Sequence, residues 1–171
     1  YLVRPLGFNA SDAEESLEKC VAEMEKRYRL FKEASRTHSK LVNSIKSYNR
    51  LVPAAENLSW WVIVLDEYAD LIINPDDKKK IEQLLGRLAA KARASGVHII
   101  IATQKPTVEV INSVLRSNLP AQLALTVKSG NESRVIMDDL GAESLSGNGD
   151  AFLKIGGKLN RLQCAMVADD Q

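Results

Sequence analysis

The sequence predicts an α/β fold: a mostly parallel sheet with flanking helices, followed by an antiparallel hairpin near the C-terminal end. Residues 60–65 and 97–102 are short apolar runs rich in β-branched side chains, as in strands buried on both faces of a parallel sheet. A helical pattern lies between them, and two parallel strands need such a crossover. The pair Gly156-Gly157 separates two later strand-like runs, which predicts the hairpin.

Length and charge limit the classes of protein. The 171 residues suffice for a single domain with a substantial core, and the 45% hydrophobic content is typical of a globular protein. Because 23 basic residues face 22 acidic ones, any nucleic-acid contact must come from local patches or loops. No apolar run approaches about 18 residues, so we expect no transmembrane segment in this chain, a cytoplasmic location, and any membrane anchor outside it. Cys20 and Cys164 have no metal-ligand spacing and are expected to be reduced core residues.

The N-terminal third is expected to form one long helix and a polar connection. Apolar residues such as Leu17, Met24 and Phe31 recur at steps of three and four over residues 11–34, which predicts an amphipathic helix. Its charged residues, Arg27 among them, are expected on the solvated face.

Residues 35–59 are polar and are expected to form a surface connection with one short helix near residues 41–48. A contact of this segment with DNA or a neighbouring subunit is the alternative. The core of the single domain then covers residues 60–167.

Two adjacent carboxylates, Asp66 and Glu67, end the first strand run. The carboxyl ends of parallel strands are where open α/β sheets bind ligands. One acid could hold Mg²⁺ and the other could deprotonate an attacking water, which is the Walker B arrangement of phosphate-hydrolysing motors. An acidic turn that only caps the next helix is the alternative.

A second polar pair is expected at the same edge of the sheet. Pro75 starts a helix that runs to about residue 94 and stops at Gly96, and the following strand ends in Thr103-Gln104. The side chain of Gln104 is placed to contact a γ-phosphate or the attacking water. The alternative is that Gln104 only satisfies backbone groups of its loop.

The remaining chain is expected to add one more parallel strand, a helix and the hairpin. The third strand is predicted over residues 122–127 and a short helix over residues 131–140. The hairpin strands are predicted over residues 151–155 and 159–167. Strands that alternate with helices predict right-handed crossovers and a parallel sheet, closed by the antiparallel edge.

Several strings in one order resemble a known family. They are IVLDEYADL (63–71), RLAAKARASGVH (87–98), ATQKPT (102–107) and GAESL (141–145). Together they are similar to the motor domain of the FtsK/SpoIIIE double-stranded DNA translocases, within the FtsK–HerA group of RecA-like ATPases. The resemblance implies a RecA-like fold, ATP and Mg²⁺ as cofactors, double-stranded DNA as partner and a hexameric ring of identical subunits.

The resemblance also implies roles for single residues. Asp66 matches the Mg²⁺-associated acid, Glu67 the catalytic base and Gln104 the polar sensor, and these three would contact the nucleotide. Arg134 matches a position proposed to reach the nucleotide of the adjacent subunit, and an i,i+4 ion pair with Asp138 is the equal alternative.

Two loops match in place the loops that follow the DNA backbone in this family. They contain Thr107 and Val108 in the first loop and Asn148 in the second, and neither loop is basic.

One feature of such motors is absent. No string in the chain reads G-x-x-x-x-G-K-S/T, the phosphate-binding loop, so we expect the chain alone to be inactive. The resemblance places this loop and much of the ring interface outside this chain, so we also expect the chain alone to be monomeric. A non-catalytic RecA-like scaffold in a DNA transfer, secretion or defence complex is the alternative function. A motor that moves protein or single-stranded DNA is a third.

Overall fold

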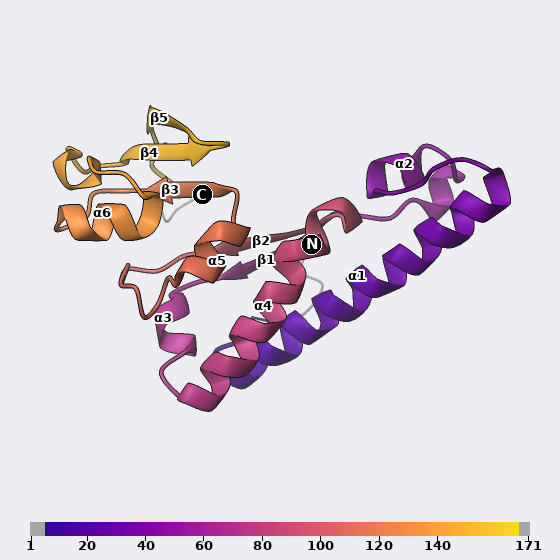
Figure 1. The fold of residues 1–171 in the computed structure, drawn as a ribbon, viewed down its shortest axis with the longest axis horizontal. Coiled ribbons are helices and arrows are strands. Elements are labelled where there is room, and N and C mark those ends of the chain that lie inside the picture. Colours follow the sequence, from indigo (N-terminus) through magenta and orange to yellow (C-terminus); the bar gives the residue numbers. More distant parts are fainter. Residues whose placement is uncertain (1–5, 168–171) are drawn as a thin grey trace. The chain divides into compact units, whose positions relative to one another are not determined.

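The structure, a computed structural model, describes residues 6–167, and the chain divides after Gln104 into two compact units. Each unit contains its own sheet. The N-terminal unit has two parallel strands with long helices, and the C-terminal unit has three antiparallel strands with short helices (Figure 1). None of the described helices is long and apolar enough to cross a membrane.

The N-terminal unit begins with a helix longer than predicted. Helix α1 (Ala10–His38) starts where the side chain of Asn9 accepts a hydrogen bond from the Asp12 amide, and it ends at Ser39 in the left-handed conformation. The polar connection then folds back on α1 through α2 (Ile45–Asn49) and the 3₁₀ turn η1 (Ala54–Glu56). A small core joins α1 to this connection; its buried members are Phe31, Ala34, Val42, Ile45 and Tyr48.

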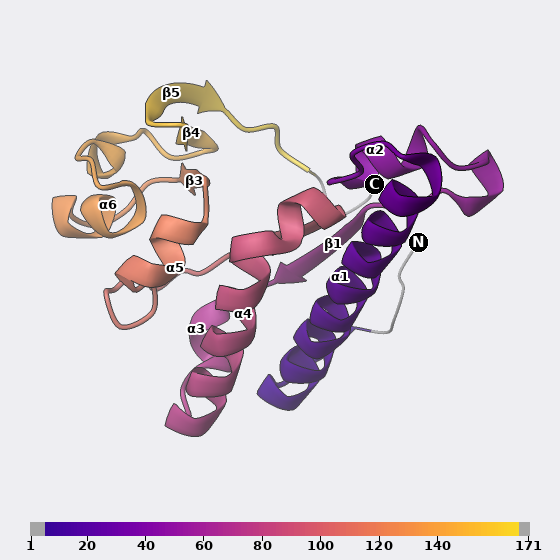
Figure 2. The ribbon, with the colours of Figure 1, turned by 45° about the vertical axis from the view of Figure 1, so that its right-hand side comes forward.

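The predicted parallel pair and its crossover helix are confirmed. Strand β1 (Trp61–Leu65) pairs in parallel with β2 (Val97–Ile101), in a register that sets Leu65 opposite Ile101. Helix α3 (Tyr68–Leu71) and helix α4 (Pro75–Ser95) connect them. The side chain of Asn74 caps the start of α4, and Gly96, with φ of 81°, ends it in the left-handed conformation. Helices α1 and α4 pack side by side (Figures 1 and 2).

The prediction that both strands are buried on both faces was wrong for this chain. Exposure alternates along them, and the side chains of Val62, Val64 and Ile100 are 59%, 58% and 53% exposed. Successive side chains of a strand point to opposite faces, and α1 and α4 provide cover for the alternate set that contains Leu65 and Val97. Apolar content therefore revealed the strands but not how many faces this chain covers.

The expected solvated face of α1 contains one buried cation. The guanidinium of Arg27 donates from Nε to Oε1 of Glu23 at 2.8 Å and from one terminal nitrogen to the carbonyl oxygen of Ser95 at 2.8 Å. It also lies 5.4 Å from the centre of the Trp61 ring. Because Arg27 is only 1% exposed, its prediction as a solvated residue was wrong. The side chain links α1 to the carbonyl of the last residue of α4 and to β1.

The C-terminal unit contains the predicted hairpin but not the predicted third parallel strand. Strands β4 (Asp150–Ile155) and β5 (Lys158–Gln163) pair in antiparallel fashion, and β3 (Ala121–Ala124) adds to the free edge of β4, also antiparallel. The strand predicted over residues 122–127 thus exists, but its partner is the hairpin. Three short elements complete the unit: α5 (Ser113–Asn118), α6 (Gly130–Met137) and the 3₁₀ turn η2 (Ala142–Ser144).

A carboxylate–guanidinium pair fixes the start of β4. Arg161 donates from Nε to Oδ1 of Asp150 at 2.9 Å and from a terminal nitrogen to Oδ2 at 2.7 Å, and the Ser146 amide also donates to Oδ2. The hydrogen bonds from Arg161, followed by the one from Ser146, hold the pKa of Asp150 well below its usual range. The pair therefore anchors the loop between Ser146 and β4.

Replacement of Arg27 is expected to unfold the N-terminal unit at lower denaturant concentration. Arg27→Leu leaves the Glu23 carboxylate and the Ser95 carbonyl without their buried partner, which costs about 3–5 kcal/mol. Urea unfolding followed by tryptophan fluorescence reports on this unit, because Trp60 and Trp61 are the only two tryptophans of the chain and both lie in this unit. Lys26→Leu is the matched control: Lys26 is exposed, 3.8 Å from the same carboxylate, and should change stability by about 0.5 kcal/mol or less. Equal losses in the two variants would contradict the assigned role.

Asp150→Asn is expected to lower stability at neutral pH and to matter less in acid. A carboxyl whose pKa is lowered by folding contributes stability above its unfolded pKa, near 4, and loses that contribution as pH falls through the folded value. The gap in melting temperature between the native chain and the variant should therefore be widest near pH 7 and should narrow progressively as the pH falls below about 4. Thermal melts from pH 7 to pH 2 measure it, and a gap that stays constant would refute the linkage.

Candidate functional site

The parallel register brings the two predicted polar pairs to one edge of the β1–β2 sheet. Asp66 and Glu67 follow β1 directly, and Thr103 and Gln104 come two and three residues after β2. The backbone joins the two exits, because the Ala102 amide donates to the Leu65 carbonyl at 2.9 Å and the Tyr68 amide donates to the Ala102 carbonyl at 2.8 Å. The acids and the polar pair therefore belong to one structural corner.

The Glu67 side chain reaches across this corner. Its Oε1 accepts a hydrogen bond from the Thr103 hydroxyl at 2.7 Å, and its Oε2 accepts one from the Gln104 amide at 3.0 Å. Glu67 has φ of 43° and ψ of 65°, a left-handed conformation that costs a non-glycine residue about 1–3 kcal/mol. The carboxylate is thus fixed against the end of β2 by donors on both oxygens.

The alternative of a plain helix cap does not fit Glu67. It stands at the N-cap position of α3, but its side chain makes no capping hydrogen bond to that helix. A capping carboxylate would accept from an amide two or three residues later. The side chain instead contacts the two residues that follow the neighbouring strand β2, which is the direction that a site at the sheet edge requires.

Asp66 offers an exposed carboxylate beside Glu67. Its Oδ1 accepts a hydrogen bond from the Glu67 amide at 3.1 Å. Residues 6–167 contain no cluster of three or more His, Cys, Asp or Glu side chains able to hold a metal by themselves. Mg²⁺ in nucleotide sites is usually held by one or two carboxylates together with phosphates and water, so a single exposed acid next to a second one fits Mg²⁺ bound with ATP.

Tyr68 anchors the turn that presents the acids. It is fully buried, and its hydroxyl has no hydrogen-bond partner among the described residues. Burial, with a smaller effect of Glu82, raises the pKa of this phenol, so it stays neutral. With its ring in the core and its amide bonded to Ala102, the residue after Glu67 cannot move freely.

Thr103 is the one residue of this corner to which the sequence analysis assigned no role. The signal was present, because Thr103 directly precedes Gln104 at the end of the same strand run. Gln104, which the sequence pattern predicted as a site residue, contacts Glu67 through its backbone amide, and Gln104 is exposed. Contact of its side chain with a γ-phosphate therefore stays a prediction.

Arg134 lies in the C-terminal unit, on α6, with an exposed side chain. The alternative ion pair with Asp138 is not what the structure shows, because Asp138 pairs with Arg116 at 3.2 Å. Backbone hydrogen bonds, and more weakly Arg134, lower the pKa of Glu143. The role of Arg134 toward a neighbouring subunit stays a prediction.

The predicted DNA-contacting residues are exposed within the C-terminal unit. Thr107 and Val108 precede α5, where the Thr107 carbonyl accepts from the amides of Val110 and Ile111. Asn148 has φ of 52°, and its carbonyl accepts from the Gln163 side chain at 2.6 Å. Their contact with DNA stays a prediction.

The two cysteines do not add a reactive site. Both are free thiols, and burial raises the pKa of Cys20, which keeps that thiol protonated. The expectation of a core position holds for Cys20, whereas Cys164 is only partly buried.

Comparison with known proteins gives a family match over most of the chain. The model described as FtsK/SpoIIIE family matches residues 2–108. DNA translocase FtsK 1 of Neisseria meningitidis serogroup A / serotype 4A (strain DSM 15465 / Z2491) is 38% identical over 194 residues, covering 100% of this chain and 23% of that protein. DNA translocase SpoIIIE of Bacillus subtilis (strain 168) is 38% identical over 181 residues, covering 100% and 22%. The chain thus spans less than a quarter of the length of these relatives.

Solved structures show the same fold. The pCW3 conjugation coupling protein TcpA, in its monomer form with ATPγS, has a TM-score of 0.80 and 24% identity, covering 94% of this chain and 46% of that chain. The cytoplasmic domain of the Thermomonospora curvata Type VII secretion ATPase EccC has a TM-score of 0.70 and 26% identity, covering 91% and 17%. The α/β fold of this chain is RecA-like, as the sequence predicted.

Proposed function

The chain belongs to the FtsK/SpoIIIE family, and from that premise we propose that it is part of an ATP-driven translocase of double-stranded DNA. Relatives at 38% identity over the whole chain are named DNA translocases, which supports DNA as the partner. Solved structures of the same fold, one with ATPγS and one named an ATPase, support ATP as the fuel. The observation that carries the catalytic assignment is the Glu67 carboxylate, held at the ligand edge of the sheet by Thr103 and Gln104.

Glu67 is proposed as the general base. A carboxylate oxygen has two acceptor positions, so each oxygen can keep its present donor and still accept a proton from an attacking water. The Thr103 hydroxyl and the Gln104 amide fix the direction of the carboxylate, and the buried Tyr68 ring fixes the backbone behind it. Asp66 would hold Mg²⁺, directly or through water, and that ion supplies charge neutralisation at the phosphates when it is bound.

The remaining assignments link hydrolysis to movement of DNA. The Gln104 side chain would contact the γ-phosphate, next to the amide that holds Glu67. Arg134 would reach the nucleotide of an adjacent subunit in a hexameric ring, where a cation stabilises charge in the transition state. The loops with Thr107, Val108 and Asn148 would follow the DNA backbone by contacts that do not depend on sequence.

The chain without a phosphate-binding loop is proposed to be inactive by itself. Backbone amides and a lysine of that loop cradle the phosphates in related ATPases, and no string of this sequence has its pattern. A role in conjugation or secretion is a second candidate, since solved relatives of this fold are named a conjugation coupling protein and a secretion ATPase. ATPase assays of the full-length protein with duplex DNA, single-stranded DNA or a secreted protein as the stimulant separate these candidates.

Glu67→Gln in the full-length protein is expected to lower DNA-stimulated ATP turnover by about 10²- to 10⁴-fold. The amide keeps the size of the side chain but cannot accept the proton of the attacking water. Steady-state ATPase assays with duplex DNA measure the loss. Glu56→Gln is the matched control, because Glu56 is an exposed acid in η1 of the same unit. Normal turnover by a folded Glu67→Gln protein would remove Glu67 from the mechanism.

Thr103→Ala is expected to lower kcat about tenfold with little change in the KM for ATP. The substitution removes one hydrogen bond to a charged acceptor, which is usually worth about 1.5–3 kcal/mol, and leaves the carboxylate less well directed. Thr103→Ser keeps the hydroxyl and should restore most of the rate. Equal kinetics for the two variants would show that Thr103 has no positioning role.

A further inference from the structure

Charge along α1 is divided between its two halves. Residues 10–25 contain six acidic residues and one basic residue, whereas residues 26–38 contain five basic residues and one acidic residue. The net charge of the whole chain is only +1, so this division is local. The second half of the helix is therefore a concentrated positive surface on a nearly neutral chain.

The acidic half is largely neutralised by contacts within the chain. Glu15 pairs with Lys19 at 2.6 Å, Glu14 pairs with Lys80 on α4 at 3.3 Å, and Glu25 pairs with Arg87 on α4. Glu23 is paired with the buried Arg27. These acids are not available to attract a second molecule.

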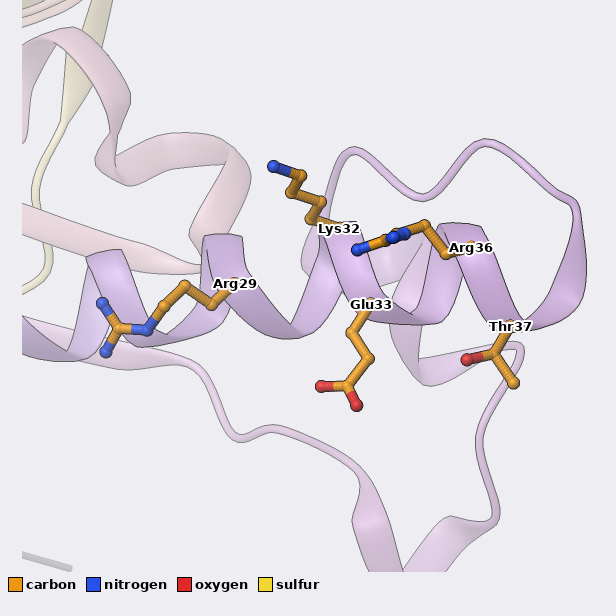
Figure 3. Close-up of a pocket in the computed structure, with 5 residues that line it drawn as sticks. All are labelled: Arg29, Lys32, Glu33, Arg36 and Thr37. Carbon is orange, nitrogen blue, oxygen red and sulfur yellow. The ribbon is translucent and has the colours of Figure 1, made fainter.

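The basic half differs because, apart from Lys26, which lies 3.8 Å from Glu23, its exposed cations are not paired in this way. Arg29, Lys32 and Arg36 line a shallow groove on α1, together with Glu33 and Thr37 (Figure 3). Within the described residues, none of these three cations takes part in a salt bridge. In Figure 3, Lys32 extends from one side of the helix, Glu33 and Thr37 from the other, and Arg36 lies between them. We call Arg29, Lys32 and Arg36 the cationic stripe.

The helix dipole does not account for the cationic stripe. Cations are favoured near the carboxyl end of a helix, but this effect falls off within the last turn. Arg36 is in the last turn of α1, while Arg29 and Lys32 come before it. Two of the three cations therefore have no structural partner that explains them.

We propose that the cationic stripe binds the phosphate backbone of duplex DNA, and this choice of partner rests on the proposed function. Residues at i, i+3 and i+7 lie on one face of a helix, and a rise of about 1.5 Å per residue places the three cations along about 10 Å. Along the axis of duplex DNA, one strand advances about 3.4 Å per phosphate, so about three phosphates span this length in the axial direction. Arginine and lysine are the usual donors in such contacts.

Other anionic partners fit the cationic stripe less well. A nucleotide site is normally concave, with a few convergent polar groups, whereas this groove is shallow and lies on the surface of a single helix. An anionic membrane is usually bound by clusters of about 4–8 basic residues. A second copy of this chain would need a free acidic surface, and four of the six acids in residues 10–25 are already paired.

The test compares two triple variants of the full-length protein in the Glu67→Gln background, where hydrolysis does not displace the DNA. The first variant carries Arg29→Gln, Lys32→Gln and Arg36→Gln. The control carries Lys79→Gln, Lys128→Gln and Lys158→Gln, which removes the same charge from exposed positions elsewhere. Binding to a mixed-sequence duplex of about 30 base pairs is measured by fluorescence anisotropy between about 50 and 200 mM salt.

The stripe variant should show a slope of log K against log salt that is shallower by about 2.7, corresponding to three lost phosphate contacts. The control variant should keep the parental slope. A parental slope in the stripe variant, or an equal change in both variants, overturns the proposal. Loss of binding to vesicles of phosphatidylserine and phosphatidylcholine with unchanged DNA binding also overturns it, in favour of a membrane. Failure of the proposed function can be told apart from failure of this proposal. It would appear as normal ATP turnover by Glu67→Gln and would not change the difference in salt slope between the two triple variants.

Discussion

The buried guanidinium of Arg27 is the interaction on which the N-terminal unit depends. It donates to the Glu23 carboxylate on its own helix and to the Ser95 carbonyl at the end of α4, and it lies over the Trp61 ring of β1. Gly96 makes this approach possible, because a β-carbon there would meet Ile45 at 2.5 Å and Arg27 at 3.3 Å, and its φ of 81° disfavours any other residue. One cation thus sets where α1, α4 and β1 meet.

That junction determines the position of the acids at the other end of β1. The strand is only five residues long and is in register with β2, so fixing its start at Trp61 also fixes its exit at Asp66. The Trp61 amide donates to the Gly96 carbonyl at one end of the ladder, and the Ala102 amide donates to the Leu65 carbonyl at the other. The structural anchor and the candidate site are the two ends of one short ladder.

Local signals in the sequence were sufficient for the crossover and the strand exits. The apolar runs, the Pro75 start, the Gly96 stop and the Asp-Glu and Thr-Gln endings all depend on neighbouring residues, and the structure places each as the pattern indicated. What failed depended on distant partners. The sequence pattern predicts Arg27 as a surface residue, because its acceptor, Ser95, lies 68 positions later in the chain. The pattern likewise predicts β3 as a parallel strand, because it does not show that β3 pairs with β4.

The same limit explains why Thr103 was not identified and why the αL backbone of Glu67 was unexpected. A strand that ended in an ordinary extended turn would direct the Glu67 side chain along its own helix as a cap. The left-handed turn directs it across the sheet instead, where Thr103 and Gln104 supply two donors. The unfavourable backbone conformation is offset by these bonds, by the Tyr68 amide and by the buried Tyr68 ring. A glutamate held in this way is directed before any substrate arrives, and that is a property that catalysis by proton abstraction requires.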